Sequence, residues 1–251
     1  MSTILELQGV TKAYDQYTVV DNFNLQVTMG ELRCLLGPNG AGKTTTMDLI
    51  TGRQKMTSGK VIFNGRNISG MTEHRIVQQG IGRKFQIPAV FKDLTVRDNL
   101  QVAFTRTTNP FMNMVEFGRG GGRARLQEVV ELVGLEKRLD ELGGNLSHGE
   151  TQWLEIGMVL TQNPKLLLMD EPTAGMTEQE TQKTSEIFNR LKGEHTLIVV
   201  EHDMTFVREI ADIITLMHLG KTLAEGPMDE VENNPKVREV YLGTEGISDA
   251  A

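Results

Sequence analysis

The sequence predicts an α/β fold that carries a helical insertion. One observation is an apolar run, a glycine-rich turn and a helical continuation in immediate succession within residues 32–50. A second is a pair of apolar, strand-length runs at residues 166–169 and 197–200, each of which ends in polar residues. Strands that alternate with helices are typical of α/β domains. The change to helical patterns between residues 94 and 160 indicates the insertion.

The length and charge of the chain narrow its possible partners. Its 251 residues are enough for one large domain or for a core with a subdomain. A formal net charge of −7 disfavours nonspecific binding to nucleic acid or anionic lipid, since both reward a basic surface. No apolar run approaches about 18 residues and the amino end lacks a signal-peptide pattern, so we expect a membrane role only through a partner. The single cysteine, Cys34, excludes an intrachain disulfide and fits a reducing compartment.

Two strands are expected near the amino end, at residues 4–10 and 19–27, because apolar and polar residues alternate there. Tyr14 lies between them, some twenty residues before the glycine-rich turn. An exposed aromatic ring at this place can stack on an adenine ring, and a tyrosine can equally pack at a strand end. The residue pattern by itself leaves both interpretations of Tyr14 open.

The glycine-rich turn matches the phosphate-loop pattern G-x-x-x-x-G-K-[ST] in the required strand–turn–helix context. Its glycines let backbone N–H groups surround a phosphate, and the new helix adds the positive end of its dipole. Lys43 can reach the β- and γ-phosphates of a nucleotide, and the Thr44 hydroxyl can ligate Mg²⁺. The residues predicted to hold the nucleotide here are Gly37, Pro38, Asn39, Gly40, Ala41, Gly42, Lys43, Thr44 and Thr45.

Three further elements are expected between the phosphate loop and the insertion. Residues 59–65 predict a short strand that enters a turn, and residues 72–79 predict a polar helix. Residues 81–86 predict a strand that ends in the polar Gln86, and Pro88 then breaks the pattern. A glutamine at a strand end is often simply a hydrogen-bonded core residue, so its function depends on whether it points at a metal.

The insertion is predicted to contain two helices joined by a surface loop. The first begins near residues 95–98, and the second has apolar residues at 126, 129, 130 and 133 and ends near Gly134. Residues 105–122 are expected to form the loop. The glycine-rich, basic run at 118–125 is not a second phosphate loop, because no strand precedes it and no Lys-Ser/Thr pair follows it.

Ser147 is predicted to cap a helix that extends to about residue 160. Together with Gly149, it exposes hydroxyl and backbone donors at a helix N-terminus. Such donors can bind an anion, or they can simply cap the helix. The local pattern leaves both interpretations open.

Two strand ends carry residues that suit nucleotide chemistry. Asp170 ends the apolar strand at 166–169 and can hold Mg²⁺, while the adjacent Glu171 can polarise an attacking water as a general base. The strand at 197–200 leads to His202, which can bond a γ-phosphate or serve a structural role. The other histidines form no metal-ligand spacing with Cys34 or with one another.

In this order, and over nearly the whole chain, these motifs resemble the ATP-binding subunits of ABC transporters. The seven matching motifs are Walker A at 37–45, the A-loop aromatic Tyr14, the Q-loop Gln86, the signature at 146–150, Walker B at 166–170, the catalytic glutamate Glu171 and the switch histidine His202. The resemblance implies a P-loop ABC ATPase fold with a mixed sheet, flanking helices and an antiparallel β part. A core at 1–86 and 161–251 would carry a helical subdomain at 87–160, inserted between the Q-loop and Walker B.

The resemblance also implies the chemistry and the ligands, which are ATP and Mg²⁺. Lys43, Glu171 and His202 would be catalytic, whereas Thr44, Gln86 and Asp170 would hold the metal. Tyr14 would bind the adenine, and the donors of Ser147 and Gly149 would face a phosphate. Two such subunits would sandwich two ATP molecules, so that Walker A of one faces the signature of the other.

Two motifs depart from the family pattern. The signature reads Leu-Ser-His-Gly-Glu, so His148 replaces a glycine and Glu150 replaces a glutamine. A carboxylate near a triphosphate would repel it, so we do not expect Glu150 to contact the nucleotide. The D-loop at residues 174–177 lacks the usual aspartate, which puts contacts across a dimer through that carboxylate in question.

A finer resemblance links residues 81–86, 147–158 and 174–177 to the ATPase subunit of bacterial urea importers, within the branched-chain amino-acid importer group. It implies uptake of urea or short amides at the cytoplasmic face of the inner membrane. The implied partners are two transmembrane permease subunits, a second ATP-binding subunit and a substrate-binding protein, with no nucleic acid. An ATPase of a branched-chain amino-acid importer and a soluble, non-transport ABC ATPase are the alternatives.

Overall fold

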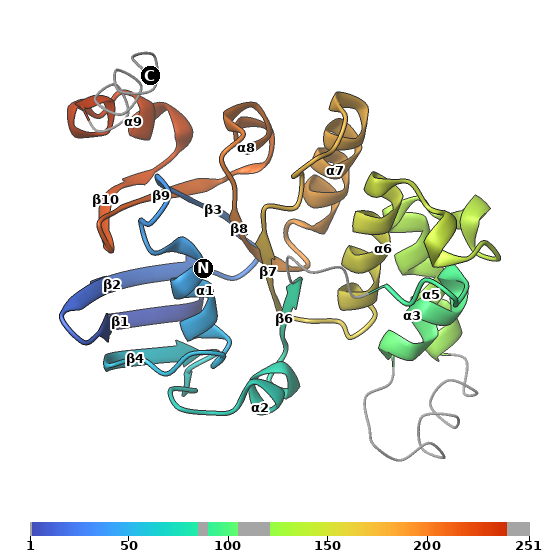
Figure 1. Cartoon of the computed structure of the whole chain (residues 1–251), viewed down its shortest axis with the longest axis horizontal. Coiled ribbons are helices and arrows are strands. Elements are labelled where there is room, and N and C mark those ends of the chain that lie inside the picture. The colour runs from blue at the N-terminus through green and yellow to red at the C-terminus, as the bar shows by residue number, and fades with distance from the viewer. Residues whose placement is uncertain (1, 85–89, 105–120, 240–251) are drawn as a thin grey trace. The chain divides into compact units, whose positions relative to one another are not determined.

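The computed structural model describes residues 2–84, 90–104 and 121–239. The chain divides into two compact units, the first made of residues 1–79 and 192–251 and the second of residues 80–191 (Figure 1). These bounds differ from those expected for the core and the helical subdomain, whose division stays a prediction. Among the described residues, no helix is both long and apolar enough to cross a membrane.

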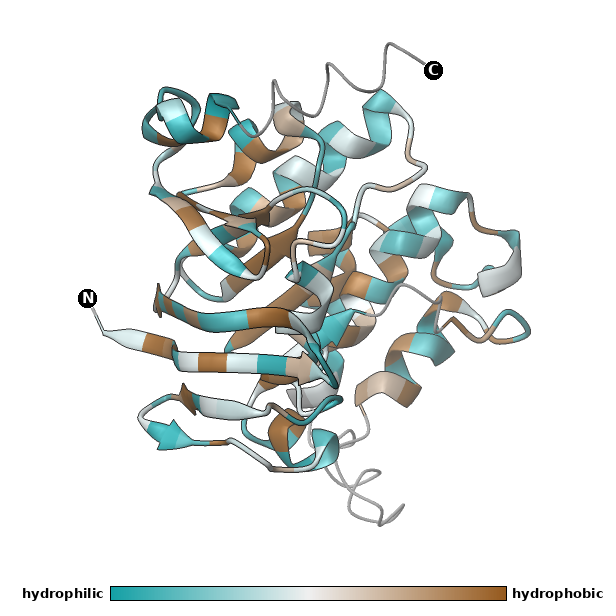
Figure 2. Ribbon diagram, turned by 60° about the vertical axis from the view of Figure 1, so that its left-hand side comes forward, coloured by the Kyte–Doolittle hydropathy of each residue, from teal (hydrophilic) through white to brown (hydrophobic). Residues whose placement is uncertain are grey.

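The first unit contains an antiparallel sheet with the strand order β2-β1-β4-β5. Its strands are β1 (Thr3–Tyr14), β2 (Tyr17–Thr28), β4 (Ser58–Phe63) and β5 (Arg66–Asn67). In β1, which starts at the N label in Figure 2, hydrophobic residues alternate with more polar ones along the strand. This alternation is typical of an antiparallel sheet with one buried face.

The strands that carry the phosphate loop belong to a second sheet of the first unit. Within this unit its strand order is β10-β9-β3-β8: β3 (Leu32–Leu36), β8 (Thr196–Val200), β9 (Ile213–His218) and β10 (Lys221–Gly226). Strand β3 runs parallel to both β8 and β9, and every residue of β3 and β8 is buried. Strands that are buried along their whole length are characteristic of parallel sheets covered on both faces.

Short helices complete the described part of the first unit. They are α1 (Lys43–Ile50), α2 (Glu73–Gln78), α8 (Met204–Ile210) and α9 (Met228–Glu232). Helix α1 buries its last five residues, which fixes the helix against the body of the unit. Its first turn is less buried and continues the phosphate loop. Asp203 caps α8 by accepting hydrogen bonds from the backbone of Thr205 and Phe206.

The second unit pairs two parallel strands with a group of helices. Its elements are β6 (Ile81–Lys84), β7 (Leu166–Asp170), α3 (Val96–Phe104), α5 (Gly121–Val133), α6 (His148–Leu160) and α7 (Glu178–Leu191). Helix α6 packs closely on α3 and α5, since a Cβ at Gly157 would lie 3.2 Å from Leu100 and 3.3 Å from Val129. A buried ion pair of 3.3 Å between Lys84 and Glu155 ties α6 to β6.

The expected strands and helices are confirmed wherever the structure describes them, with two corrections. Tyr14 is the last residue of β1 and pairs with Tyr17 of β2, so it belongs to a hairpin end and does not lie in a separate turn. The expected loop at 105–122 is wrong at its end, because α5 already begins at Gly121. The helix former Ala124 and the apolar stripe that follows extend the helix backward through the glycines. Residues 105–120 and Gln86 lie outside the described residues.

Candidate nucleotide-binding site

The phosphate loop joins the buried end of β3 to the start of α1. Gly37 and Gly42 have φ angles of 149° and 102°, a backbone region that favours glycine. A side chain at Gly42 would place its Cβ 2.8 Å from the carbonyl oxygen of Val19, and one at Gly37 would clash with the carbonyl of Met217. The loop therefore depends on these glycines for its conformation and for its close approach to neighbouring backbone.

Lys43 supplies the positive charge of this loop. Its Nζ donates hydrogen bonds to the carbonyl oxygens of Gly37 (2.6 Å) and Pro38 (3.1 Å), so the side chain folds back over the loop. The helix cap at Gly42 has no side-chain hydrogen bond, and Thr44 is exposed. Backbone donors at a helix start, beside an ammonium group and without a capping side chain, fit the phosphates of a nucleotide.

His202 lies at the same sheet edge as the phosphate loop. Because β3 and β8 are parallel and Leu35 is in register with Val200, both strands end at one edge of the sheet. Gly37 and His202 each follow two residues after these partners, at the carboxyl ends where ligands bind in open α/β sheets. The His202 side chain is 71% exposed, and its Nδ1 lies 3.8 Å from the carboxylate of the buried Glu201.

Tyr14 is exposed at the end of the β1–β2 hairpin, with 46% of its surface accessible. The Lys12 ammonium lies over one face of the ring, 4.4 Å from its centroid, and the Tyr14 hydroxyl is hydrogen-bonded to Gln54. The ring is thus held in place from two sides and still presents apolar surface. This arrangement is compatible with the predicted role as an adenine platform.

In the second unit, two carboxylates follow one another at the end of β7. Asp170 is 2% exposed, and its Oδ2 lies 3.8 Å from Nη2 of Arg83, whose side chain is 5% exposed. Glu171 has a φ angle of 47°, the left-handed region that only a minority of non-glycine residues adopt. Residues held in this region cluster at functional sites, which supports the interpretation of Glu171 as a catalytic residue.

Ser147 caps α6 through a complete capping box. Its hydroxyl accepts from the backbone N–H of Glu150 (3.1 Å), and the Glu150 carboxylate accepts from the backbone N–H of Ser147 (2.9 Å). Glu150 also accepts from Nε of Arg138 at 2.8 Å. Burial raises the pKa of Glu150, but the Ser147 N–H and the Arg138 guanidinium outweigh it and lower the pKa below its ordinary value. The Glu150 carboxylate therefore caps the start of its own helix, as expected for a residue that does not contact nucleotide.

His148 and Glu180 connect the start of α6 to the residues that follow Glu171. The His148 Nε2 lies 2.9 Å from the carbonyl oxygen of Ala174, in hydrogen-bond contact. The Glu180 carboxylate accepts from the Ser147 hydroxyl at 3.2 Å and from the Gly149 backbone N–H at 3.1 Å. Residues 177–180 read Thr-Glu-Gln-Glu, a capping-box pattern in which Glu180 is the cap partner of Thr177, but this pattern does not indicate the contact of Glu180 with α6. Both helix starts can be recognised in the sequence, yet no local pattern pairs them.

Comparison with known proteins identifies the family. A family model described as ABC transporter matches residues 20–174. The chain belongs to the ABC transporter family. A second model, described as branched-chain amino acid ATP-binding cassette transporter, matches residues 221–247. Cassettes of this family bind ATP with Mg²⁺ and hydrolyse it, so the predictions of an ATPase and of these two ligands are confirmed.

Two curated relatives and one solved structure extend the match to nearly the whole of this chain. The high-affinity branched-chain amino acid transport ATP-binding protein BraF of Pseudomonas aeruginosa is 33% identical and covers 96% of this chain and 98% of its own. The probable branched-chain amino acid transport ATP-binding protein LivG of Archaeoglobus fulgidus is 34% identical, with 96% of both chains covered. A crystal structure of the ADP conformation of an ABC transporter cassette has a TM-score of 0.85 at 29% identity, over 97% of this chain and all of its own. The predicted fold class is therefore confirmed.

The structure places the ABC motifs in two groups. The first unit brings the Walker A loop and His202 to one sheet edge, and the second brings the signature residues Ser147 and Gly149 to the segment after Glu171. Gln86 lies outside the described residues, so its role as a metal ligand stays a prediction. The described residues hold no group of three or more His, Cys, Asp or Glu side chains that could bind a metal by themselves.

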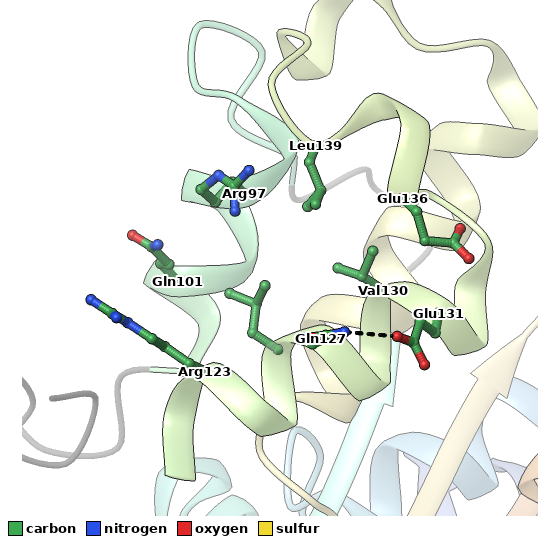
Figure 3. Close-up of a pocket in the computed structure, with 9 residues that line it drawn as sticks. Arg97, Gln101, Arg123, Gln127, Val130, Glu131, Glu136 and Leu139 are labelled. Atoms are coloured by element: carbon green, nitrogen blue, oxygen red, sulfur yellow. Dashed lines mark hydrogen bonds between the residues drawn. The ribbon is translucent and has the colours of Figure 1, made fainter. Parts of the chain in front are cut away.

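A cavity of about 500 Å³ in the second unit is lined by residues outside all of these motifs. Figure 3 shows it between α3 and α5, with the apolar Val130 and Leu139 beside the charged Arg97 and Glu136. At its rim, Gln127 donates a hydrogen bond of 3.0 Å to Glu131. None of the predicted site residues lines this cavity.

Proposed function

We propose that the chain is the ATP-hydrolysing subunit of an importer of branched-chain amino acids. The observation that carries this proposal is the match to BraF and LivG over 96% of the chain, since both are named for that transport. The family model matched at residues 221–247 supports the same substrate class. The sequence patterns first favoured urea or short amides, but the names of these relatives support the amino-acid importer better.

In the proposed mechanism, two ATP-binding subunits sandwich ATP between the Walker A loop of one and the signature of the other. The second subunit is a further copy of this chain or a related one. Lys43 and the loop amides neutralise the phosphates, while the Ser147 hydroxyl and the Gly149 N–H of the opposite subunit bond the γ-phosphate. Thr44, Gln86 and Asp170 would hold Mg²⁺, which neutralises charge that develops on the phosphate oxygens.

Glu171 is proposed to act as the general base. Its carboxylate takes a proton from the attacking water while the water oxygen bonds to the γ-phosphorus. The bond between that phosphorus and the β–γ bridging oxygen breaks, and its electron pair leaves with ADP. His202 holds the γ-phosphate during the transfer, and this contact is released when the phosphate leaves after hydrolysis.

Closure and reopening of the sandwich would drive transport. The two subunits are closed only while ATP bridges them, so hydrolysis reopens them. Residues 87–94, which follow Gln86, are proposed to contact the transmembrane permease subunits and carry the motion to them. This scheme places the chain at the cytoplasmic face of the membrane, bound through its partners, together with a substrate-binding protein.

The Glu171→Gln variant tests the chemical step. It is expected to bind ATP and accumulate as a dimer, while its ATPase rate falls by about 10²- to 10⁴-fold, the usual contribution of a general base. Glu194→Gln, at an exposed position away from the motifs, serves as the control. An ATPase rate in Glu171→Gln close to that of the parent would refute the role of Glu171.

Purification from the native membrane tests the cargo. Copurification with permeases and a binding protein that carries leucine, isoleucine or valine is expected. A binding protein that carries urea would overturn the substrate and keep the transporter. Copurification with ribosomes or DNA, in place of membrane proteins, would favour the non-transport ATPase.

A further inference from the structure

Glu180 lies in the first turn of α7, and its two carboxylate oxygens have different partners. Oε2 accepts from the backbone N–H and the hydroxyl of Thr177, both at 2.9 Å. Oε1 accepts from the Ser147 hydroxyl at 3.2 Å and from the Gly149 backbone N–H at 3.1 Å. One carboxylate therefore receives four hydrogen bonds from two helix starts.

The contact with α6 goes beyond what a helix cap needs. The capping box of α7 is complete with Oε2 and Thr177 alone, since the Thr177 hydroxyl accepts in turn from the Glu180 backbone N–H. The approach of Oε1 to α6 depends on Gly149, because a Cβ there would clash with the Glu180 carboxylate. The Thr177 N–H lowers the pKa of Glu180 most strongly, and the Gly149 and Ser147 donors lower it further. The charged carboxylate is thus the form that this pocket of donors holds.

A carboxylate oxygen and a phosphate oxygen compete for the same donors. Both are anionic acceptors that form short, charge-assisted hydrogen bonds with N–H and O–H groups. A hydroxyl such as that of Ser147 has only one proton to donate, and it is directed at Glu180. A terminal phosphate cannot take this donor without displacing the carboxylate, and the two anions repel each other at such short range.

We propose that Glu180 is an internal competitor for the terminal phosphate of ATP at Ser147 and Gly149. This inference rests on the proposed function, in which these two residues face the nucleotide of the opposite subunit. Closure of the ATP sandwich then requires the Glu180 side chain to turn away from α6. The competition raises the ATP concentration at which two subunits associate, and it leaves the binding of ATP to a single subunit unchanged.

The Glu180→Gln variant separates the charge from the cap. A glutamine oxygen can still accept from Thr177, as glutamine commonly does at this position of a capping box. With its oxygen on Thr177, the glutamine turns its amide nitrogen toward Ser147 and Gly149, and this nitrogen accepts no hydrogen bond from either donor. We expect ATP to compete about threefold better at each site, and the dimer association constant to rise about tenfold because two sites close together.

The experiment measures ATP-dependent dimer formation of the full chain by analytical ultracentrifugation, with Glu171→Gln in every variant to stop hydrolysis. Glu178→Gln is the matched control, because Glu178 is exposed in the same turn of α7 and makes no described contact with α6. ATP binding at protein concentrations below dimerisation verifies that each variant is folded. Tighter dimers for Glu180→Gln alone would support the proposal.

Two other results are informative. The parent in this experiment carries Glu171→Gln alone. If the parent dimerises with ATP, and Glu180→Gln dimerises no more tightly than the parent or than Glu178→Gln, the competition is refuted and the proposed function stands. If the parent binds ATP and forms no dimer with it at any concentration, the sandwich in the proposed function fails, and the inference fails with it.

Discussion

The chain carries two sets of hydrogen-bond donors that suit a phosphate, and their electrostatics are opposite. The Walker A loop contains a cation, Lys43, whose ammonium group donates to the backbone carbonyls of Gly37 and Pro38. The signature contains the neutral donors of Ser147 and Gly149, which hold the Glu180 carboxylate. A phosphate that enters the first site gains a cation, whereas one that enters the second must displace an anion.

The two helix starts differ in the same sense. Helix α1 begins at a glycine with no side-chain cap, so its first-turn donors suit a ligand. Helix α6 begins with a full capping box between Ser147 and Glu150, so some of the backbone donors at its start are already hydrogen-bonded within the chain. We therefore expect the Walker A loop to determine how tightly one subunit binds ATP. The signature should determine only how readily two subunits close.

The largest effect that separates the two sites is expected for Lys43→Ala. Charge-assisted hydrogen bonds are worth about 1.5–3 kcal/mol each, so losing those to the β- and γ-phosphates should weaken ATP binding by about 100-fold or more. Isothermal titration of the full chain with ATP and Mg²⁺ measures this directly. Lys60→Ala, at an exposed position of β4, is the control. A change below about threefold in Lys43→Ala would show that the loop charge does not determine affinity.

A smaller effect, of a different kind, is expected for Ser147→Ala. The variant loses a helix N-cap, which typically stabilises a protein by about 1 kcal/mol, and it also loses a donor to Glu180. Chemical denaturation should show a free energy of unfolding lower by about this amount, with unchanged ATP affinity at low protein concentration. Ser58→Ala, at an exposed position of β4, should leave both unchanged. A large loss of ATP affinity in Ser147→Ala would remove the distinction between the two sites.

The two sites were also predictable from the sequence to different degrees. The Walker A motif is local: nine consecutive residues, which follow a strand and continue into the first turn of a helix, determine its shape, so the motif predicts the loop and the direction of its donors. The contacts of Ser147 are not local, because Glu180 lies 33 residues further along the chain. Each helix start could be recognised as a cap, but no sequence spacing indicates that one carboxylate serves both.

The element boundaries show the same limit. The strand at Leu32–Leu36 is confirmed because a short run with four apolar residues before a glycine permits few alternatives. Tyr14 was expected between two strands, yet pairing with Tyr17 across the hairpin extends β1 to include it. Glycines at 121 and 122 indicated a loop, but the packing of the apolar stripe on α5 overrides their weak propensity. In both cases tertiary contacts, which sequence patterns do not reveal, decided where the element ends.

The smallest expected effect concerns acid, and it should act on the signature site alone. Glu150 and Glu180 both have lowered pKa values. Burial raises the pKa of Glu150, but the Ser147 N–H and the Arg138 guanidinium lower it by more, while the pKa of Glu180 is lowered chiefly by the Thr177 N–H. A carboxyl group whose pKa is lower in the folded than in the unfolded state stabilises the fold above its unfolded pKa. That stabilisation is lost as the pH falls through the folded pKa.

The parent protein should therefore lose stability at pH values below the ordinary glutamate pKa of 4.5, and a double variant Glu150→Gln, Glu180→Gln should lose less. Near pH 7 both carboxyl groups are ionised in the folded and in the unfolded state, so the two proteins should differ little there in the slope of stability against pH. Denaturation curves at several pH values from neutral to acid measure this difference. Of the two carboxylates, the one more exposed to solvent contributes less to stability, so the effect on the free energy of unfolding should be modest.

Identical acid slopes for the two proteins would show that these carboxylates are not held more strongly than in the unfolded chain. The Glu180 carboxylate would then be a weak competitor for phosphate, and the contrast between the two sites would rest on Lys43 alone.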